Sequence, residues 1–325
     1  MDPFYSNGIV REDQYAQTMR SLVQPALQAI RIDRLVPGFD GRDLHVTLCP
    51  AENARGTIIL VHGFTENGEK FSEIIHAFHL SGYTVAVHDA RGHGRSWRDP
   101  KVASLSDTYV HCFDDYVKDL DTLLATVYRE LPGPKYLVCH SMGGAVSALY
   151  LEEHPDAFQK AVLNAPMIAP NTGGIPKGAA VALCTFMKGI GRGKRPIMGS
   201  KGYTGHEDFD TSCTTCRSRF DWYDEMKFHE PLFQNTSPTY GWTLEAVRVT
   251  DRILKKGEVE KLTLPVLVMQ ASEDNSVLNE PMDAFVQRLP NGRKIRFEGA
   301  RHEIFRCKDT DVCRWMDEIL AFLAD

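Results

Sequence analysis

Ser141 stands where a predicted strand meets a predicted helix, and its surroundings suit nucleophilic chemistry. The apolar run 137–139 leads into the serine, and Gly143 and Gly144 open the segment that follows it. A turn this sharp lifts the hydroxyl out of the backbone and strains the serine, so the residues two positions away must be small. Gly143 meets this condition on the helix side. Cys139 takes the strand-side position that more often holds glycine, and it is also small.

A serine hydroxyl is a poor nucleophile at neutral pH, so it needs a base to take its proton and an acid to orient that base. In folds that place the nucleophile on such a turn, the chain order is serine, acid, histidine. Asp274 follows the strand-like run 266–270, and His302 follows the run 294–297. The sequence therefore predicts a triad of Ser141, Asp274 and His302 at one edge of a sheet.

Two other carboxylates compete for the role of the acid. Glu273 and Glu303 are chain neighbours of Asp274 and His302, and an aspartate after a strand is often only a helix cap. We favour Asp274 because three candidates in the required order, each at a strand end, rarely coincide by chance. We give no catalytic role to His93, which lies in a glycine-rich turn whose charges are expected to fix neighbouring loops.

Acyl transfer passes through an oxyanion that backbone N–H groups stabilise. Met142, directly after the predicted nucleophile, supplies one such group. The second is expected on the loop after an earlier strand. There the tripeptide 62–64 ends a buried strand, which makes the Phe64 N–H the predicted second donor. We interpret His62 and His140 as structural residues that pack beside these loops.

Strand-like and helical segments alternate along most of the chain. Strands are expected at 30–36, 44–49, 57–62, 83–89, 135–140, 160–164, 265–270 and 294–297. Helices are expected at 12–27, 68–80, 113–131 and 142–154, and after each of the last two strands. This alternation predicts an α/β fold with a mostly parallel sheet covered by helices on both faces.

The alternation stops between residues 168 and 245. This stretch is first rich in glycine, proline and polar residues and then rich in aromatic ones. Ligands bind outside the carboxyl ends of the strands in open α/β sheets. We therefore expect a cap at 168–245, inserted over a core formed by residues 1–167 and 246–325. Its apolar segment 179–190, flanked by lysines and arginines, is expected either to pack on the core or to face micelles and membranes.

Composition excludes several classes of protein. The 325 residues are 43% hydrophobic and carry a formal net charge of −6 without a long basic run, which argues against a nucleic-acid partner. We expect neither a secretory signal nor a membrane span. The eight scattered cysteines are interpreted as reduced thiols of a cytoplasmic protein. Cys213 and Cys216 form a lone C-x-x-C with too few further ligands nearby for a metal site.

Several motifs occur together over residues 56–320. They are the tripeptide 62–64 with Glu66 and Phe71, the D-x-R-G-x-G-x-S stretch 89–96, the H-S-M-G-G stretch 140–144, the stretch 164–167, Asp274, and the stretch 299–303. Together they resemble the α/β-hydrolase family that includes monoacylglycerol lipases and bacterial lysophospholipases of the L2 type. The stretches 218–220 and 238–242 favour the L2 branch. The resemblance implies a serine esterase for single-acyl lipids, with the same triad and the same oxyanion donors.

These observations predict a serine carboxylic ester hydrolase that releases fatty acid from a lysophospholipid or a monoacylglycerol through an acyl-enzyme. No metal or organic cofactor is required for this chemistry. Two alternatives stay open, an esterase for small non-lipid esters and a ligand-binding sensor that keeps the fold but turns over slowly. The expected partner is a lipid ester, with transient contact to a membrane or micelle surface through the cap.

Overall fold

The computed structural model describes residues 2–325 and is built on an eight-stranded sheet with the order β1-β2-β4-β3-β6-β7-β9-β10. The strands are β1 (Ile32–Pro37), β2 (Asp43–Cys49), β3 (Thr57–Val61), β4 (Thr84–His88), β6 (Lys135–His140), β7 (Lys160–Asn164), β9 (Val266–Ala271) and β10 (Gly292–Phe297). Only the pairings β1–β2 and β2–β4 are antiparallel. The predicted mostly parallel sheet is confirmed.

The strands of the sheet centre are apolar because both of their faces are covered. Every residue of β3, β4 and β9 is buried, whereas β1 at the edge is mostly exposed. Parallel strands place their carboxyl ends at one edge, so β3, β6, β9 and β10 deliver the loops that follow them to the same end of the molecule.

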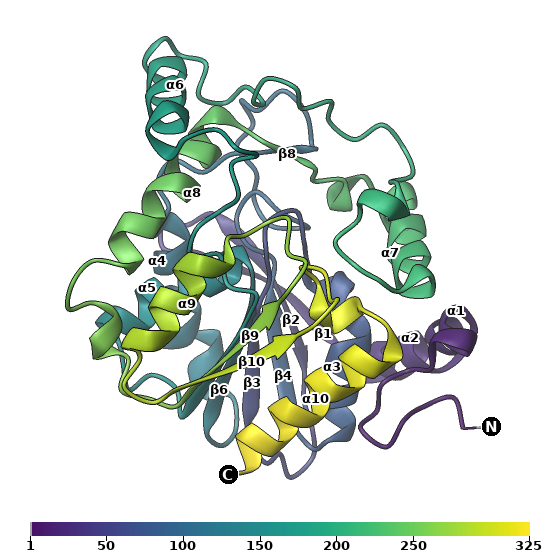
Figure 1. Cartoon of the computed structure of the whole chain (residues 1–325). Helices are drawn as coiled ribbons and strands as arrows, with labels where there is room; N and C mark the ends of the chain where they lie inside the picture. The colour runs from purple at the N-terminus through teal and green to yellow at the C-terminus, as the bar shows by residue number, and fades with distance from the viewer. Residues whose placement is uncertain (1) are drawn as a thin grey trace.

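Helices cover both faces of the sheet (Figure 1). One face carries α4 (Asp114–Ala125), α5 (Met142–Glu153) and α9 (Asn279–Arg288), and the other carries α3 (Ser72–Leu80) and α10 (Asp309–Ala324). Short 3-10 turns connect these elements: η3 (Gly68–Phe71), η4 (Val127–Glu130), η7 (Val259–Lys261) and η8 (Ile304–Arg306). Each face buries its own apolar cluster, as an α/β sandwich requires.

The N-terminal segment is helical, as expected, but its geometry varies along its length. It consists of η1 (Glu12–Gln14), α1 (Tyr15–Thr18), the π-helical turn η2 (Met19–Val23) and α2 (Gln24–Ile30). It therefore continues three residues past the predicted end at 27.

The helix predicted over 113–131 is wrong in one respect, because it is not continuous. α4 ends at Ala125, and Thr126 leaves the helical region with φ −113° and ψ −98°. The Thr126 N–H and hydroxyl both donate to the Thr122 carbonyl, at 3.1 and 2.6 Å, and α4 ends there. Val127 and Leu131 still pack against the same core. The apolar spacing therefore predicts their packing correctly, but it does not predict that the helix is interrupted.

Residues 168–245, here called the cap, contribute no strand to the large sheet. They contain α6 (Lys177–Gly189), η5 (Phe209–Thr211), α7 (Arg217–His229), η6 (Pro231–Phe233), β8 (Ser237–Pro238) and the start of α8 (Tyr240–Ile253). β8 pairs with β5 (Asp107–Thr108) of the core. The boundary proposed at 245 falls inside α8. Figure 1 shows α6 and α8 over one side of the core and α7 over the other.

Arg219 ties α7 to the core. Its side chain is fully buried and pairs with Glu73 of α3 at 3.0 Å and with Asp309 of α10 at 2.8 Å. It also donates to the carbonyl of Val10 at 2.7 Å. Because three separate segments satisfy one buried guanidinium, this end of the cap is held firmly in place.

In residues 2–325, no helix combines the length and the apolar character that crossing a bilayer requires.

Candidate active site

Ser141 alone connects β6 to α5, and its backbone is strained. It has φ 51° and ψ −117°, outside the regions that residues other than glycine normally occupy. The surrounding loops hold this conformation. The Ser141 N–H donates to the Asn164 carbonyl at 3.1 Å, and the Ser141 carbonyl accepts from the N–H groups of Gly144 and Met167 at 2.8 Å each.

Close backbone approach explains the small residues around the turn. A Cβ on Gly143 would lie 2.2 Å from the carbonyl oxygen of Val61, and one on Gly144 would lie 2.5 Å from Pro166 Cβ. Cys139 is buried, and its thiol donates to the Val162 carbonyl at 3.4 Å. Burial raises the pKa of Cys139 to about 12, so the sulfur stays protonated.

Asp274 and His302 form a buried pair at the same edge of the sheet. His302 Nδ1 lies 2.6 Å from Asp274 Oδ2, and the two side chains are 6% and 0% exposed. Asp274 Oδ1 accepts from the backbone N–H groups of Ser276 and Val277 at 2.8 and 2.9 Å. These bonds fix the carboxylate, which in turn orients the imidazole through its Nδ1.

The pair shifts the protonation of both partners. Burial alone would raise the pKa of Asp274, but the charge of His302 and the hydrogen bonds lower it on balance. Burial alone would lower the pKa of His302, but the Asp274 carboxylate raises it on balance. The arrangement therefore stabilises an imidazolium at His302, the state that a general base reaches once it has taken a proton.

His140 joins the serine turn to the histidine loop. Its Nε2 lies 3.3 Å from the His302 carbonyl oxygen, and the two rings are 4.6 Å apart. Its Nδ1 lies 2.9 Å from Glu66 Oε2. The interpretation of His140 as mere packing is therefore incomplete, because both of its ring nitrogens face acceptors on other loops. No hydrogen bond joins the Ser141 hydroxyl to His302 within residues 2–325. The contact of His140, the chain neighbour of Ser141, with the His302 carbonyl is what brings the serine turn to the Asp274–His302 pair.

Glu66 is a site residue to which the sequence assigned no role. It is 2% exposed, and its Oε2 accepts the Gly63 N–H at 2.6 Å. Its Oε1 pairs with Lys70 at 3.0 Å. Burial would raise the pKa of Glu66, but His140 and Lys70 hold it well below its usual range. The i, i+4 spacing of Glu66 and Lys70 was the one sequence signal for this pair.

The loop 62–64 lies against the serine. A Cβ on Gly63 would be 2.9 Å from Ser141 Cβ, so only glycine allows this approach. In the described chain, residues 2–325, the Phe64 N–H donates to no protein acceptor. Met142 is the first residue of α5, where a helix leaves its N–H groups unpaired. Both residues therefore have backbone N–H groups near Ser141 without a protein acceptor in the described chain, and their role as oxyanion donors stays a prediction.

The remaining histidines and acids near the site have structural partners. His62 Nδ1 donates to the Gly63 carbonyl at 2.7 Å while its Nε2 accepts the Ala90 N–H at 2.8 Å, which confirms its structural interpretation. Glu273 is exposed, and Glu303 pairs with Lys70 and Arg306. Asp274 is therefore the acid that contacts His302.

The glycine-rich turn after β4 holds loops together, as expected. Arg91 is buried and donates to Asp119 at 2.6 and 2.7 Å, and Arg95 pairs with Glu69 at 2.9 Å. His93 Nδ1 faces the Arg91 carbonyl at 3.1 Å.

Comparison with known proteins shows the family of this chain. The model of the Hydrolase_4 family, described as serine aminopeptidase S33, matches residues 52–309. The chain belongs to this family. The hydrolase is 30% identical over 288 residues to lysophospholipase L2 of Escherichia coli (strain K12), covering 84% of this chain and 81% of the relative. It is 24% identical over 265 residues to monoglyceride lipase of Rattus norvegicus, covering 79% and 78%.

Solved structures confirm the α/β-hydrolase fold. A soluble variant of monoglyceride lipase from Saccharomyces cerevisiae superposes with a TM-score of 0.68 at 18% identity, covering 90% of this hydrolase and 96% of that chain. Monoacylglycerol lipase of Paleococcus ferrophilus superposes with a TM-score of 0.65 at 20% identity, covering 86% and 98%.

Proposed function

We propose that this hydrolase cleaves the carboxylic ester of a single-acyl lipid, a lysophospholipid or a monoacylglycerol, through an acyl-enzyme. The observation that carries the proposal is the buried Asp274–His302 pair at 2.6 Å beside the strained Ser141. The names of the relatives, lysophospholipase L2 and monoglyceride lipase, support the substrate class. Neither step of this chemistry needs a metal or an organic cofactor.

The proposed reaction has two steps. His302 Nε2 takes the Ser141 hydroxyl proton as the serine oxygen attacks the ester carbonyl, and the N–H groups of Phe64 and Met142 stabilise the oxyanion. The intermediate collapses, and His302 gives the proton to the leaving alcohol. A water then attacks the acyl-enzyme, His302 takes its proton, and the fatty acid leaves with return of that proton to Ser141. Asp274 orients His302 and stabilises its charged form throughout.

The cap supports a second part of the proposal, transient contact with a micelle or membrane surface. α6 buries Ala180 and Cys184 toward the rest of the cap. The rest of its surface and the flanking residues expose large apolar side chains: Ile175, Leu183, Phe186, Ile190 and Met198. An apolar helix face that stands in water is suited to the interface of a lipid aggregate.

We also propose a reducing, cytoplasmic location, which the free thiols support.

The nucleophile is tested by Ser141→Ala. Loss of the nucleophile of a triad costs about 10⁶-fold in kcat, so we expect release of fatty acid to fall to background on every ester. A fluorophosphonate probe should label the wild-type protein at Ser141 only. Circular dichroism verifies that the variant is folded, and probe labelling that persists in it would contradict the assignment.

The substrate class is tested by a panel in which the three lipids carry the same acyl chain. Lysophospholipid, monoacylglycerol and diacylglycerol are compared with one another and with a short soluble ester by kcat/KM. We expect both single-acyl lipids to exceed the other two. A clear preference for the short ester would replace the lipid proposal by the small-ester alternative, and a burst of one product per enzyme without turnover would favour the sensor.

A further inference from the structure

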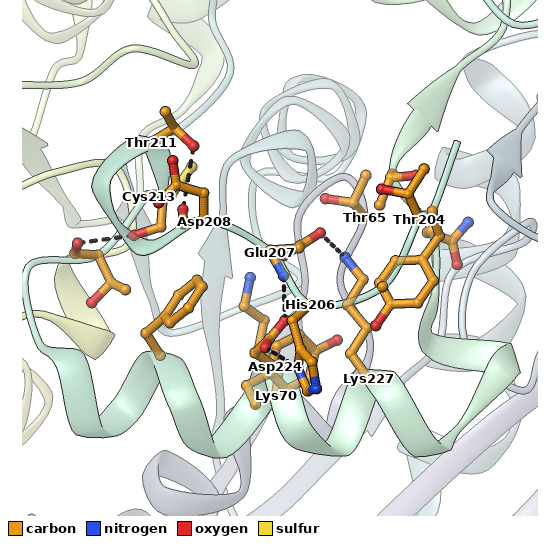
Figure 2. Close-up of a pocket in the computed structure, with 18 of the residues that line it drawn as sticks. Thr65, Lys70, Thr204, His206, Glu207, Asp208, Thr211, Cys213, Asp224 and Lys227 are labelled. Atoms are coloured by element: carbon orange, nitrogen blue, oxygen red, sulfur yellow. Dashed lines mark hydrogen bonds and ion pairs between the residues drawn. The ribbon is translucent and has the colours of Figure 1, made fainter. Parts of the chain in front are cut away.

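A cavity of about 660 Å³ lies between the cap and the core. Its walls are the cap loop 201–214 and one face of α7, and its floor is formed by core residues that include Lys70 and Arg306. Figure 2 shows these side chains converging from the loop and from the helix. Thr65 and Glu303 also line it. Since these residues follow Phe64 and His302 in the chain, the cavity adjoins the candidate active site.

Lys227 of α7 is the unusual group in this cavity. Its side chain is 4% exposed, and its only ion-pair partner among residues 2–325 is Glu207 at 2.6 Å. Glu207 lies on the cap loop and is 40% exposed. Burial lowers the pKa of Lys227 even though Glu207 acts against this. One carboxylate therefore does not compensate the buried ammonium, which keeps further N–H groups for another acceptor.

Two residues that line the cavity carry buried hydroxyl groups that lack partners in the described chain. Tyr203 Oη and Thr236 Oγ1 are buried and make no hydrogen bond within the described chain. Both residues line the cavity, and Lys227 Nζ lies 5.7 Å from the centre of the Tyr203 ring. Buried hydroxyls of folded proteins normally have a partner, so two unpaired ones on residues that line a polar cavity indicate a missing acceptor. An ammonium with two hydroxyls is a donor set that suits phosphate oxygens.

We infer that this cavity binds the phosphate-bearing head group of the substrate, with Lys227, Tyr203 and Thr236 as donors. Glu207 then occupies the anion position in the empty enzyme and moves aside when the head group enters. The inference rests on the proposed function, and it selects lysophospholipid over monoacylglycerol as the preferred substrate. The acyl ester lies at Ser141, and the glycerol backbone passes Thr65 to reach the cavity.

The displacement of Glu207 by phosphate can be tested in a distinctive way. Substitutions of the two partners of this ion pair should change the affinity for the head group in opposite directions. In the Ser141→Ala protein at pH 6.5 and low salt, calorimetry measures the binding of glycerophosphoethanolamine, glycerol and inorganic phosphate. We expect Lys227→Gln to weaken binding of glycerophosphoethanolamine about 10- to 100-fold. Glu207→Gln should tighten it, because the competing carboxylate is neutralised. Tyr203→Phe, which keeps the ring, should weaken it.

The outcomes separate the alternatives. If Lys227→Gln and Glu207→Gln both weaken binding, or neither changes it, the pair is a structural ion pair and the inference is wrong. Inorganic phosphate bound as tightly as glycerophosphoethanolamine would show a site for free phosphate instead. Lys256→Gln, at an exposed lysine outside the cavity, is the matched control and should bind like the parent protein.

Kinetics distinguish failure of the inference from failure of the proposed function. With one acyl chain, the ratio of kcat/KM for lysophospholipid to that for monoacylglycerol should fall about 10- to 100-fold in Lys227→Gln. An unchanged ratio would overturn the head-group site while leaving the lipid hydrolase intact. A wild-type protein that hydrolyses neither lipid would refute the proposed function. Calorimetry would still measure head-group binding and so would test the inference separately.

Discussion

The fold lowers the pKa of Asp274 and raises the pKa of His302. A general base must be neutral before it accepts a proton, so kcat/KM should fall as pH decreases through the pKa of His302. Because the Asp274 carboxylate raises this pKa on balance, we expect the acidic limb of the pH profile above the ordinary histidine value of about 6.5.

Asp274→Asn tests both the role of the acid and this shift. The amide no longer favours the productive tautomer of His302, so activity should fall on the order of 10⁴-fold. Without the carboxylate, only the smaller effects of Glu303 and Glu66 oppose the lowering of the His302 pKa by burial, and the acidic limb of the residual activity should move to lower pH. Rates are measured on a soluble ester between pH 5 and 9.

Two carboxylates serve as controls for Asp274→Asn. Glu273→Gln changes an exposed neighbour and should leave the rate and the limb unchanged. Glu303→Gln removes a charge that Lys70 and Arg306 share, so it should lower the free energy of unfolding more than the rate. A loss with Glu273→Gln equal to that with Asp274→Asn would show that the wrong acid has been chosen.

The turn between β6 and α5 depends on side-chain size at position 139. Cys139 is 2% exposed and lies two residues before Ser141, so Cys139→Gly should keep most activity. Cys139→Leu should remove it, because a larger side chain at a packed site displaces the backbone beside the strained turn. Cys49→Leu, at a buried cysteine of β2 away from the turn, is the control. Activity is measured per folded protein, and an active Cys139→Leu would contradict the steric explanation.

The exposed face of α6 should matter only on aggregated substrate. The double change of Phe186 and Ile190 to Ser should reduce hydrolysis of micellar lysophospholipid several-fold, because it removes apolar area that enters the interface. Hydrolysis of a short soluble ester should stay near wild type.

A matched control for this face exists on the core. Leu35 and Leu80 are 63% and 59% exposed, close to the 62% and 52% of Phe186 and Ile190. Changing both leucines to Ser should affect neither substrate, and a loss on micelles equal to that of the α6 variant would argue against interfacial contact. Salt should have little effect, since Lys188 and Lys194 are already paired with Glu245 and Asp99.

The stability of the whole molecule should depend on Glu152. This residue of α5 is 7% exposed, and its Oε1 has no partner within residues 2–325. Burial, aided by Glu258, raises the pKa of Glu152 to about 8. The folded state therefore holds a proton that the unfolded chain, with a glutamate pKa of about 4.3, has released. Stability should fall as pH rises between these two values.

Glu152→Gln removes this pH-dependent cost. At pH 9 the variant should be more stable than wild type by up to about 5 kcal/mol, the value that a pKa shift from about 4.3 to about 8 implies, and at pH 5 by only about 1 kcal/mol. Urea unfolding at pH 5 and pH 9 measures the difference. Glu153→Gln changes the exposed neighbour and should be neutral at both values. Equal stability of Glu152→Gln and wild type at pH 9 would show that Glu152 ionises normally in the folded state.

The sequence by itself determined the parallel sheet and the positions of Ser141, Asp274 and His302 at strand ends. Both rest on local physics: apolar runs form buried strands, and parallel strands deliver their following loops to one edge. The small residues at 139 and 143 likewise follow from sterics within a few residues of the turn. The catalytic roles stay predictions, whereas the contact between Asp274 and His302 is present in the structure.

Only the tertiary structure decided which charges meet between the cap and the core. Lys70 and Glu303 are 233 residues apart in the chain, and Lys227 meets Glu207 because the cap loop folds back over α7. No local pattern specifies such pairs, because their energy depends on how separate segments dock and on how much water they exclude. For the same reason the break at Thr126 and the cavity beside the active site could not be derived from residue spacing.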